Sequence, residues 1–314
     1  MKTKGPLLLL ALGLALGAST APVPVRAQAR PQAPIFGTGI EIINLNLSVT
    51  DAGNNFVTDL GERDFAVFED GIRQELSLFT HENLPISLVL MIDTSASMEE
   101  KLATAQAAAI RFTKTLRTQD AAQVVQFNDR ATTLQPFSND LLLLEAAIKK
   151  TEASGPTALH NALYVALKDL TKEKKAAELR RRAIVLLSDG EDTASLVTDE
   201  QVLELAKKSE INIYAISLRT SRAQDRLRQA FSQAEYLVNA LTRETGGRAY
   251  FPSSIGELDS VYDRIAEELR TLYSIGYVSA NARRDGKWRR IVVRVPDREG
   301  ITIRHKLGYY APRG

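Results

Sequence analysis

The sequence predicts an α/β fold, with a Rossmann-like, doubly wound and mostly parallel sheet beside a small β module built from strands near both ends of the chain. Two observations predict it. Short apolar runs alternate with amphipathic helical stretches through the middle of the chain, and runs with a two-residue period stand on either side. Strand–helix alternation favours a parallel sheet wrapped by helices, with right-handed crossovers. A two-residue period is typical of strands with one buried face.

Residues 1–29 have the layout of a secretory signal peptide: a basic start, a short apolar run and a small-residue end at Ala27-Gln28-Ala29. The apolar run is shorter than the roughly 20 residues of a membrane span, which favours cleavage over a membrane anchor. Residues 30–38, rich in proline and glycine, are expected to form a linker. We therefore expect an exported protein, periplasmic or extracellular, with no stable membrane span after cleavage.

Composition excludes several classes of protein. The chain has no cysteine, which excludes disulfides, thiolate metal sites, thiol redox chemistry and a lipoprotein anchor. Its formal charge of +2 becomes −1 when the three basic residues of the expected signal, Lys2, Lys4 and Arg26, are removed. A charge this close to zero gives no indication of nucleic-acid binding.

An N-terminal β segment is expected over residues 39–82. One strand is predicted where apolar residues alternate with polar ones, at Ile43, Leu45, Leu47 and Val49. Asp70-Gly71 lies between two further strand-like runs and indicates a hairpin, because both central residues of a type I′ turn have positive φ. Calcium binding by Glu69 and Asp70 is an alternative, and a plain turn is the preferred interpretation.

The α/β domain is expected over residues 83–272. Four apolar runs predict strands buried on both faces, at 86–93, 121–128, 182–189 and 211–218. Apolar residues at steps of three and four predict helices over 102–116, 159–170 and about 257–272. Residues 273–314 return to strand-like runs, which we expect to pair with the N-terminal β segment, since neither group buries enough apolar surface alone.

Oxygen-bearing side chains follow the predicted strands where ligands bind in open α/β sheets, at the carboxyl ends. Asp93 ends one strand and is followed by Ser95 and Ser97, Asp189 ends another, and Thr157 precedes a helix. In an extended loop Asp93, Ser95 and Ser97 point to one side. Carboxylates and hydroxyls are ligands for hard divalent cations.

Each residue also has a plain structural interpretation. Ser97 and Glu100 match a capping box, Asp189 could be a turn aspartate, and Thr157 could cap the first turn that follows Pro156. The coincidence of all three features at strand ends is what favours a cation site.

These motifs, "MIDTSAS", "SGPTALHNAL" and "VLLSDGED", resemble the von Willebrand factor type A domain with its metal-ion-dependent adhesion site, over roughly residues 85–254. The resemblance implies a site for Mg²⁺, with Mn²⁺ or Ca²⁺ as alternatives. Ser95 and Ser97 would coordinate directly beside Asp93, Thr157 directly or through water, and Asp189 mostly through water. Pro156 stands where many relatives have a second glycine. The flanking β segments resemble an exported bacterial subfamily frequent in Acidobacteria.

The expected function is therefore non-enzymatic binding of a protein partner, whose Asp or Glu completes the coordination of the metal. One alternative is a structural envelope or assembly component in which the metal stabilises a loop. The other is a metal-dependent hydrolase. It is disfavoured because the chain has only three histidines, His81, His160 and His305, and no Gly-x-Ser-x-Gly motif.

Overall fold

The structure is a computed structural model that describes residues 41–82, 84–172, 180–189, 192–218 and 233–313. The expected signal peptide and linker lie outside the described residues. A six-stranded sheet forms the α/β domain, in the order β10-β9-β8-β5-β6-β7. Its strands are β5 (Ile86–Asp93), β6 (Ala121–Phe127), β7 (Ala131–Ser138), β8 (Arg181–Ser188), β9 (Ile211–Ser217) and β10 (Arg248–Tyr250).

Only β7 runs antiparallel among the described strands of this sheet, and the other pairs are parallel. The predicted α/β class is therefore confirmed. The sequence analysis did not predict β7, which contains Pro136 and lies at the edge of the sheet. Proline is tolerated there because an edge strand leaves some backbone N–H positions unpaired.

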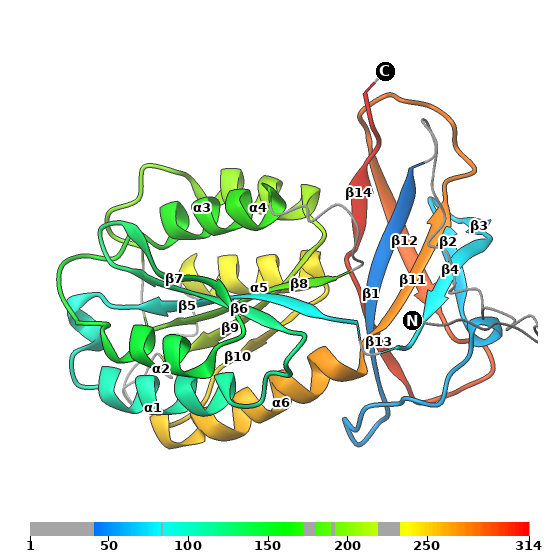
Figure 1. Ribbon diagram of the computed structural model, residues 1–314. Helices are drawn as coiled ribbons and strands as arrows, with labels where there is room; N and C mark the ends of the chain where they lie inside the picture. Colours follow the sequence, from blue (N-terminus) through cyan, green and yellow to red (C-terminus); the bar gives the residue numbers. More distant parts are fainter. Residues whose placement is uncertain (1–40, 83, 173–179, 190–191, 219–232, 314) are drawn as a thin grey trace, which may run out of the picture. The chain divides into compact units, whose positions relative to one another are not determined.

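Helices cover both faces of the sheet (Figure 1). On one face β5 places Leu88, Leu90 and Ile92 against helices α1 (Leu102–Thr113), α2 (Leu141–Lys149) and α6 (Leu258–Thr271). On the other face Val89 and Met91 lie in the core formed with α3 (Leu159–Lys172), α4 (Asp199–Lys208) and α5 (Gln233–Thr245). Every residue of β5 is buried, so this strand is the centre of both cores.

The β module contains two four-stranded antiparallel sheets, ordered β13-β1-β11-β4 and β14-β12-β2-β3. It combines strands from both ends of the described chain: β1 (Ile42–Thr50), β2 (Ala66–Glu69), β3 (Ile72–Gln74), β4 (Leu76–Thr80), β11 (Tyr273–Val278), β12 (Trp288–Arg294), β13 (Thr302–Arg304) and β14 (Gly308–Tyr310). The described residues also form the short 3₁₀ helices η1 (Glu62–Asp64), η2 (Ala96–Met98) and η4 (Ile255–Glu257).

The C-terminal run "ITIRHKLGYY", residues 301–310, forms two separate short strands. β13 pairs with β1, whereas β14 pairs with β12 in the other sheet. The chain changes sheets at His305, which is buried and whose Nε2 accepts a hydrogen bond from the backbone N–H of Val293.

The predicted hairpin is present between β2 and β3. Asp70 has φ 47° and Gly71 has φ 85°, the positive values that the turn requires. Asp70 Oδ1 accepts a hydrogen bond from the backbone N–H of Arg290 at 2.9 Å, and Glu69 points into the interior, where its side chain is 2% exposed. The two carboxylates thus have separate structural partners, which supports the turn interpretation over calcium binding.

Arg181 links the start of β8 to the end of α6. Its guanidinium donates to the carbonyl oxygens of Leu269 and Leu272 and to Ser274 Oγ, and the residue is 2% exposed. The cation lies at the C-terminus of a helix, where the macrodipole favours positive charge. Burial lowers the pKa of Arg181 to about 10.

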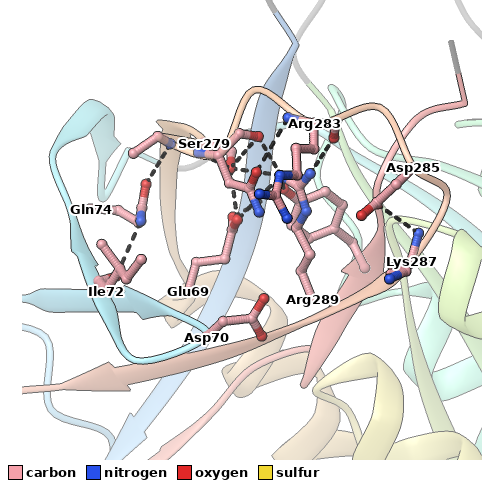
Figure 2. A network of polar contacts seen from close by, with 12 residues as sticks. Glu69, Asp70, Ile72, Gln74, Ser279, Arg283, Asp285, Lys287 and Arg289 are labelled. Carbon is pink, nitrogen blue, oxygen red and sulfur yellow. Dashed lines mark hydrogen bonds and ion pairs between the residues drawn. The ribbon is translucent and has the colours of Figure 1, made fainter.

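A buried ion pair joins the strands of the β module (Figure 2). Arg289 Nη1 lies 3.3 Å from Glu69 Oε1, with side chains that are 4% and 2% exposed. Glu69 also accepts hydrogen bonds from the hydroxyls of Tyr277, Ser279 and Tyr309 at 2.7–3.0 Å. A buried carboxylate is tolerated only with such partners, so this network fixes how β2, β11, β12 and β14 pack.

Arg289→Met is expected to destabilise the fold by about 3–5 kcal/mol, because it leaves Glu69 buried without its cation. The double variant Glu69→Gln/Arg289→Met should lose much less than the two single losses combined. Urea unfolding followed by circular dichroism measures both quantities. The matched control is Arg298→Met, which removes an exposed pair with Asp59 and should change little. Equal effects of the two arginine substitutions would contradict the account.

Candidate metal centre

Asp93 is the last residue of β5 and is fully buried. Its Oδ1 accepts a hydrogen bond from the backbone N–H of Ser95 at 2.8 Å, and its Oδ2 accepts one from Ser188 Oγ at 2.5 Å. Burial raises the pKa of Asp93, while the hydrogen bonds from Ser188 and Ser95 oppose the rise. The site thus begins with a buried carboxylate whose described partners are all neutral donors.

A chain of hydrogen bonds connects the other residues. Ser95 Oγ lies 3.0 Å from Ser97 Oγ, and Ser97 Oγ donates to Asp189 Oδ1 at 2.8 Å. Thr94 turns the other way, since its hydroxyl donates to the carbonyl oxygen of Phe127. The alternation predicted for this loop is therefore present. Four of the five predicted site residues, Asp93, Ser95, Ser97 and Asp189, lie together at the carboxyl ends of β5 and β8.

The capping-box interpretation of Ser97 is wrong. Ser97 lies inside η2, and α1 begins only at Leu102, with Lys101 as its N-cap residue and no side-chain cap. The Ser97 hydroxyl instead donates a hydrogen bond to Asp189, which lies 92 residues away in the sequence.

Thr157 lies on a loop that is hydrogen-bonded to both neighbouring loops. The carbonyl oxygen of Gly155 accepts from Ala96 N–H at 3.0 Å, and that of Thr157 accepts from Thr193 and Ala194 N–H at 2.8 and 3.0 Å. Gly155 has φ +72°, a conformation that favours glycine. Thr157 is buried, and no hydrogen bond joins its hydroxyl to the other four predicted ligands within the described residues. The backbone therefore places Thr157 between the two ligand loops.

Two residues of the site were missed in the sequence analysis. Ser188 binds Asp93, and the Lys101 ammonium forms an ion pair with Asp189 Oδ2. The sequence signal for Ser188 was its position at the end of a buried strand, directly before Asp189. The signal for Lys101 was a lysine at the start of a helix, where the macrodipole disfavours a cation.

His160, the histidine nearest to Thr157 in sequence, links the start of α3 to the loop that follows β8. Its Nδ1 lies 3.2 Å from the carbonyl oxygen of Val197, and its backbone N–H donates to Asp192 Oδ1. Asp192 also accepts from Ser195 Oγ at 2.6 Å. These contacts hold the loop after β8 against the start of α3.

The donor set fits a hard divalent cation. It consists of two carboxylates and three hydroxyls, the oxygen ligands that Mg²⁺ and Ca²⁺ prefer. Within the described ranges, no three His, Cys, Asp or Glu side chains gather as a metal-binding group. A site with only two carboxylates would not form such a group, because its remaining protein ligands are hydroxyls.

Residues 88–191 match the family model described as the von Willebrand factor type A domain. The match covers about a third of the chain and includes Asp93, Ser95, Ser97, Thr157 and Asp189. This part of the chain is a von Willebrand factor type A-type domain. A comparison with curated proteins found no match.

Several solved structures are similar to this chain at low identity. The vWF domain of the type V pili tip protein Mfa5 from Porphyromonas gingivalis is 16% identical, with 59% of this chain and 95% of that chain covered and a TM-score of 0.46. The PilB minor pilin from Streptococcus sanguinis is 14% identical, with 61% and 63% covered and a TM-score of 0.49. Proximal thread matrix protein 1 from the mussel byssus, with a zinc-occupied MIDAS motif, is 16% identical, with 64% and 49% covered and a TM-score of 0.49. This chain spans less than two thirds of the pilin and about half of the mussel protein.

Asp93→Asn is expected to be at least as stable as the wild type when EDTA is present. The raised pKa means that the folded chain binds this proton more tightly than the unfolded chain does. The free energy of unfolding therefore falls as the pH rises from 3.8, the ordinary pKa of an aspartate, through the raised pKa of Asp93 in the folded chain. Asparagine carries no charge, so the substitution removes this loss of stability at pH 7. The Ser188 hydroxyl can reverse its direction to meet the new NH₂ group.

The matched control is Asp120→Asn. Asp120 accepts from two backbone N–H groups, those of Ile86 and Arg117, which cannot reverse, so this variant should lose roughly 1–3 kcal/mol. Urea unfolding at pH 7 compares the two variants. A large loss for Asp93→Asn would contradict the assignment of Asp93 as a costly buried charge.

Proposed function

We propose that this chain is an exported, divalent-cation-dependent protein-binding module. Asp93, Ser95, Ser97, Thr157 and Asp189 hold Mg²⁺, or Mn²⁺ or Ca²⁺ in its place, and an Asp or Glu of a partner protein supplies the last ligand. The observation that carries the proposal is the chain of hydrogen bonds from Ser95 through Ser97 to Asp189, beside the buried carboxylate of Asp93.

The exposure of the residues supports an open coordination position. Asp93 is 0% exposed and Ser95 1% exposed, whereas Ser97 is an exposed residue. Of the five proposed ligands Ser97 is the one that is exposed in the described structure, so a partner's carboxylate would approach from its side. The two carboxylates of the site balance the two charges of a bound Mg²⁺, and the Lys101 ammonium beside Asp189 adds one further positive charge. The energy of such a contact depends on the larger surface that surrounds it.

Binding is favoured over hydrolysis because each histidine has another partner. The His81 ring stacks on Tyr273 at 4.2 Å between ring centroids, and His160 and His305 are hydrogen-bonded as described above. Within the described residues, no hydrogen bond or ion pair joins any of the three side chains to the five proposed ligands. A metal-dependent hydrolase would need a group positioned to transfer protons at the metal.

Export rests on the N-terminal sequence, with its signal-peptide layout. In the part of the chain that the structure describes, no helix combines the length and the hydropathy of a membrane span. The proposed partner is a protein, and neither the charge nor the site favours a nucleic acid.

Asp93→Ala is expected to abolish Mg²⁺ and Mn²⁺ binding while the fold remains intact, because Asp93 supplies the innermost charge of the site. Isothermal titration calorimetry on the mature chain measures the binding, and circular dichroism measures the fold. Asp140→Asn is the matched control, since Asp140 is an exposed N-cap of α2 and should leave binding unchanged.

Absence of binding to the wild type at millimolar metal would contradict the proposal. Unfolding of the wild type on addition of EDTA would instead favour the structural component, in which the metal stabilises a loop. Retention of the fold in EDTA, with reversible metal binding, supports the binding module.

A further inference from the structure

Lys101 is the cation nearest to the proposed ligands in the described structure. Its ammonium forms an ion pair with Asp189 Oδ2, and the side chains of Lys101 and Asp189 are 24% and 4% exposed. The other carboxylate oxygen, Oδ1, accepts the hydrogen bond from Ser97 Oγ. Both oxygens of Asp189 are therefore engaged, one by a proposed metal ligand and one by a positive charge.

The position of Lys101 is unfavourable without this pairing. It is the N-cap residue of α1, where its side chain makes no capping hydrogen bond, and the first turn of the helix contains no acidic residue. A cation at a helix N-terminus is disfavoured by the macrodipole, whereas residues such as Ser or Asp would cap the helix. Helix formation alone thus does not explain a lysine here, and the buried carboxylate of Asp189 is the group that holds it.

We propose that Lys101 is an internal cation that competes with the divalent metal for Asp189 and so lowers the metal affinity of the site. This inference rests on the proposed function. A dication bound beside Ser97 must either displace the ammonium from Asp189 or share the carboxylate with it. Displacement breaks the ion pair with Asp189, and sharing places two like charges on one buried carboxylate. Either cost weakens metal binding. Lys101 therefore sets the metal concentration at which the module can bind its partner.

A purely structural ion pair makes a different prediction. If Lys101 only ties the loop before α1 to the end of β8, its removal would change the stability of the fold and leave metal affinity unchanged or weaker. Competition predicts the opposite sign for affinity: removal of the lysine tightens metal binding.

The test is a calorimetric titration of the full chain with Mg²⁺ and with Mn²⁺, in the wild type, Lys101→Met and Lys101→Arg. Loss of one positive charge beside a dication is expected to tighten binding by roughly tenfold. Lys101→Arg keeps the charge and should bind with nearly wild-type affinity. Urea unfolding of each variant in EDTA records the stability separately.

Lys114→Met is the matched control for charge. Lys114 follows the other end of α1 and pairs on the surface with Glu145 at 3.6 Å. The substitution removes the same charge from the opposite end of α1, about 20 Å from Lys101 along the helix axis. The metal affinity of this variant should therefore stay within about twofold of the wild type. The combined variant Lys101→Met/Asp189→Asn tests the route, because the gain should shrink when Asp189 no longer carries its charge.

Unchanged or weaker affinity of Lys101→Met, with wild-type binding intact, would overturn the competition and leave the proposed function standing. A gain that is undiminished in the Asp189→Asn background would also overturn it. If neither protein binds metal, the proposed function fails and the inference fails with it.

Discussion

The burial of β5 on both faces is the constraint on which the site depends. This strand lies between β6 and β8, and helices cover both faces of the sheet, so the strand is apolar from Leu88 to Ile92 and its carboxylate comes where the strand ends. Asp93 occupies that end. Parallel pairing with β8 brings Asp189 to the same edge, and loops from α3 and η2 bring the hydroxyls. A sequence that satisfies the two cores thereby also brings two carboxylates and several hydroxyls to one point.

Charge in this region is arranged by depth. Asp93 is innermost and its described partners are neutral donors, so its negative charge is stabilised incompletely, as its raised pKa indicates. Asp189 lies nearer the surface and is paired with Lys101. A divalent cation would therefore meet two different carboxylates. Asp93 has only neutral partners among the described residues, and Asp189 is already paired with Lys101. This difference links the proposed binding function to the affinity that Lys101 is inferred to set.

The buried strands β5, β6, β8 and β9 and the strand-end position of Asp93 could be predicted from sequence because they follow from local periodicity, whereas the edge strand β7 was missed. The partners of Ser97 and Asp189 could not, because they depend on contacts between distant segments. Ser97 and Glu100 satisfy the capping-box pattern, yet the hydroxyl binds a carboxylate 92 residues away. Similarly, the Glu69–Arg289 pair and the division of "ITIRHKLGYY" between two sheets depend on tertiary packing, which a single sequence does not encode as a pattern.

The most direct test of the central claim is the anomalous diffraction of Mn²⁺ in crystals of the mature chain. The account predicts one strong peak in contact with Ser95 Oγ and Ser97 Oγ and beside the carboxylate of Asp93, at distances of roughly 2–2.3 Å from its direct protein ligands. A well-ordered loop over Asp93 to Ser97 with no peak, or a peak bound only by residues outside this cluster, would contradict it.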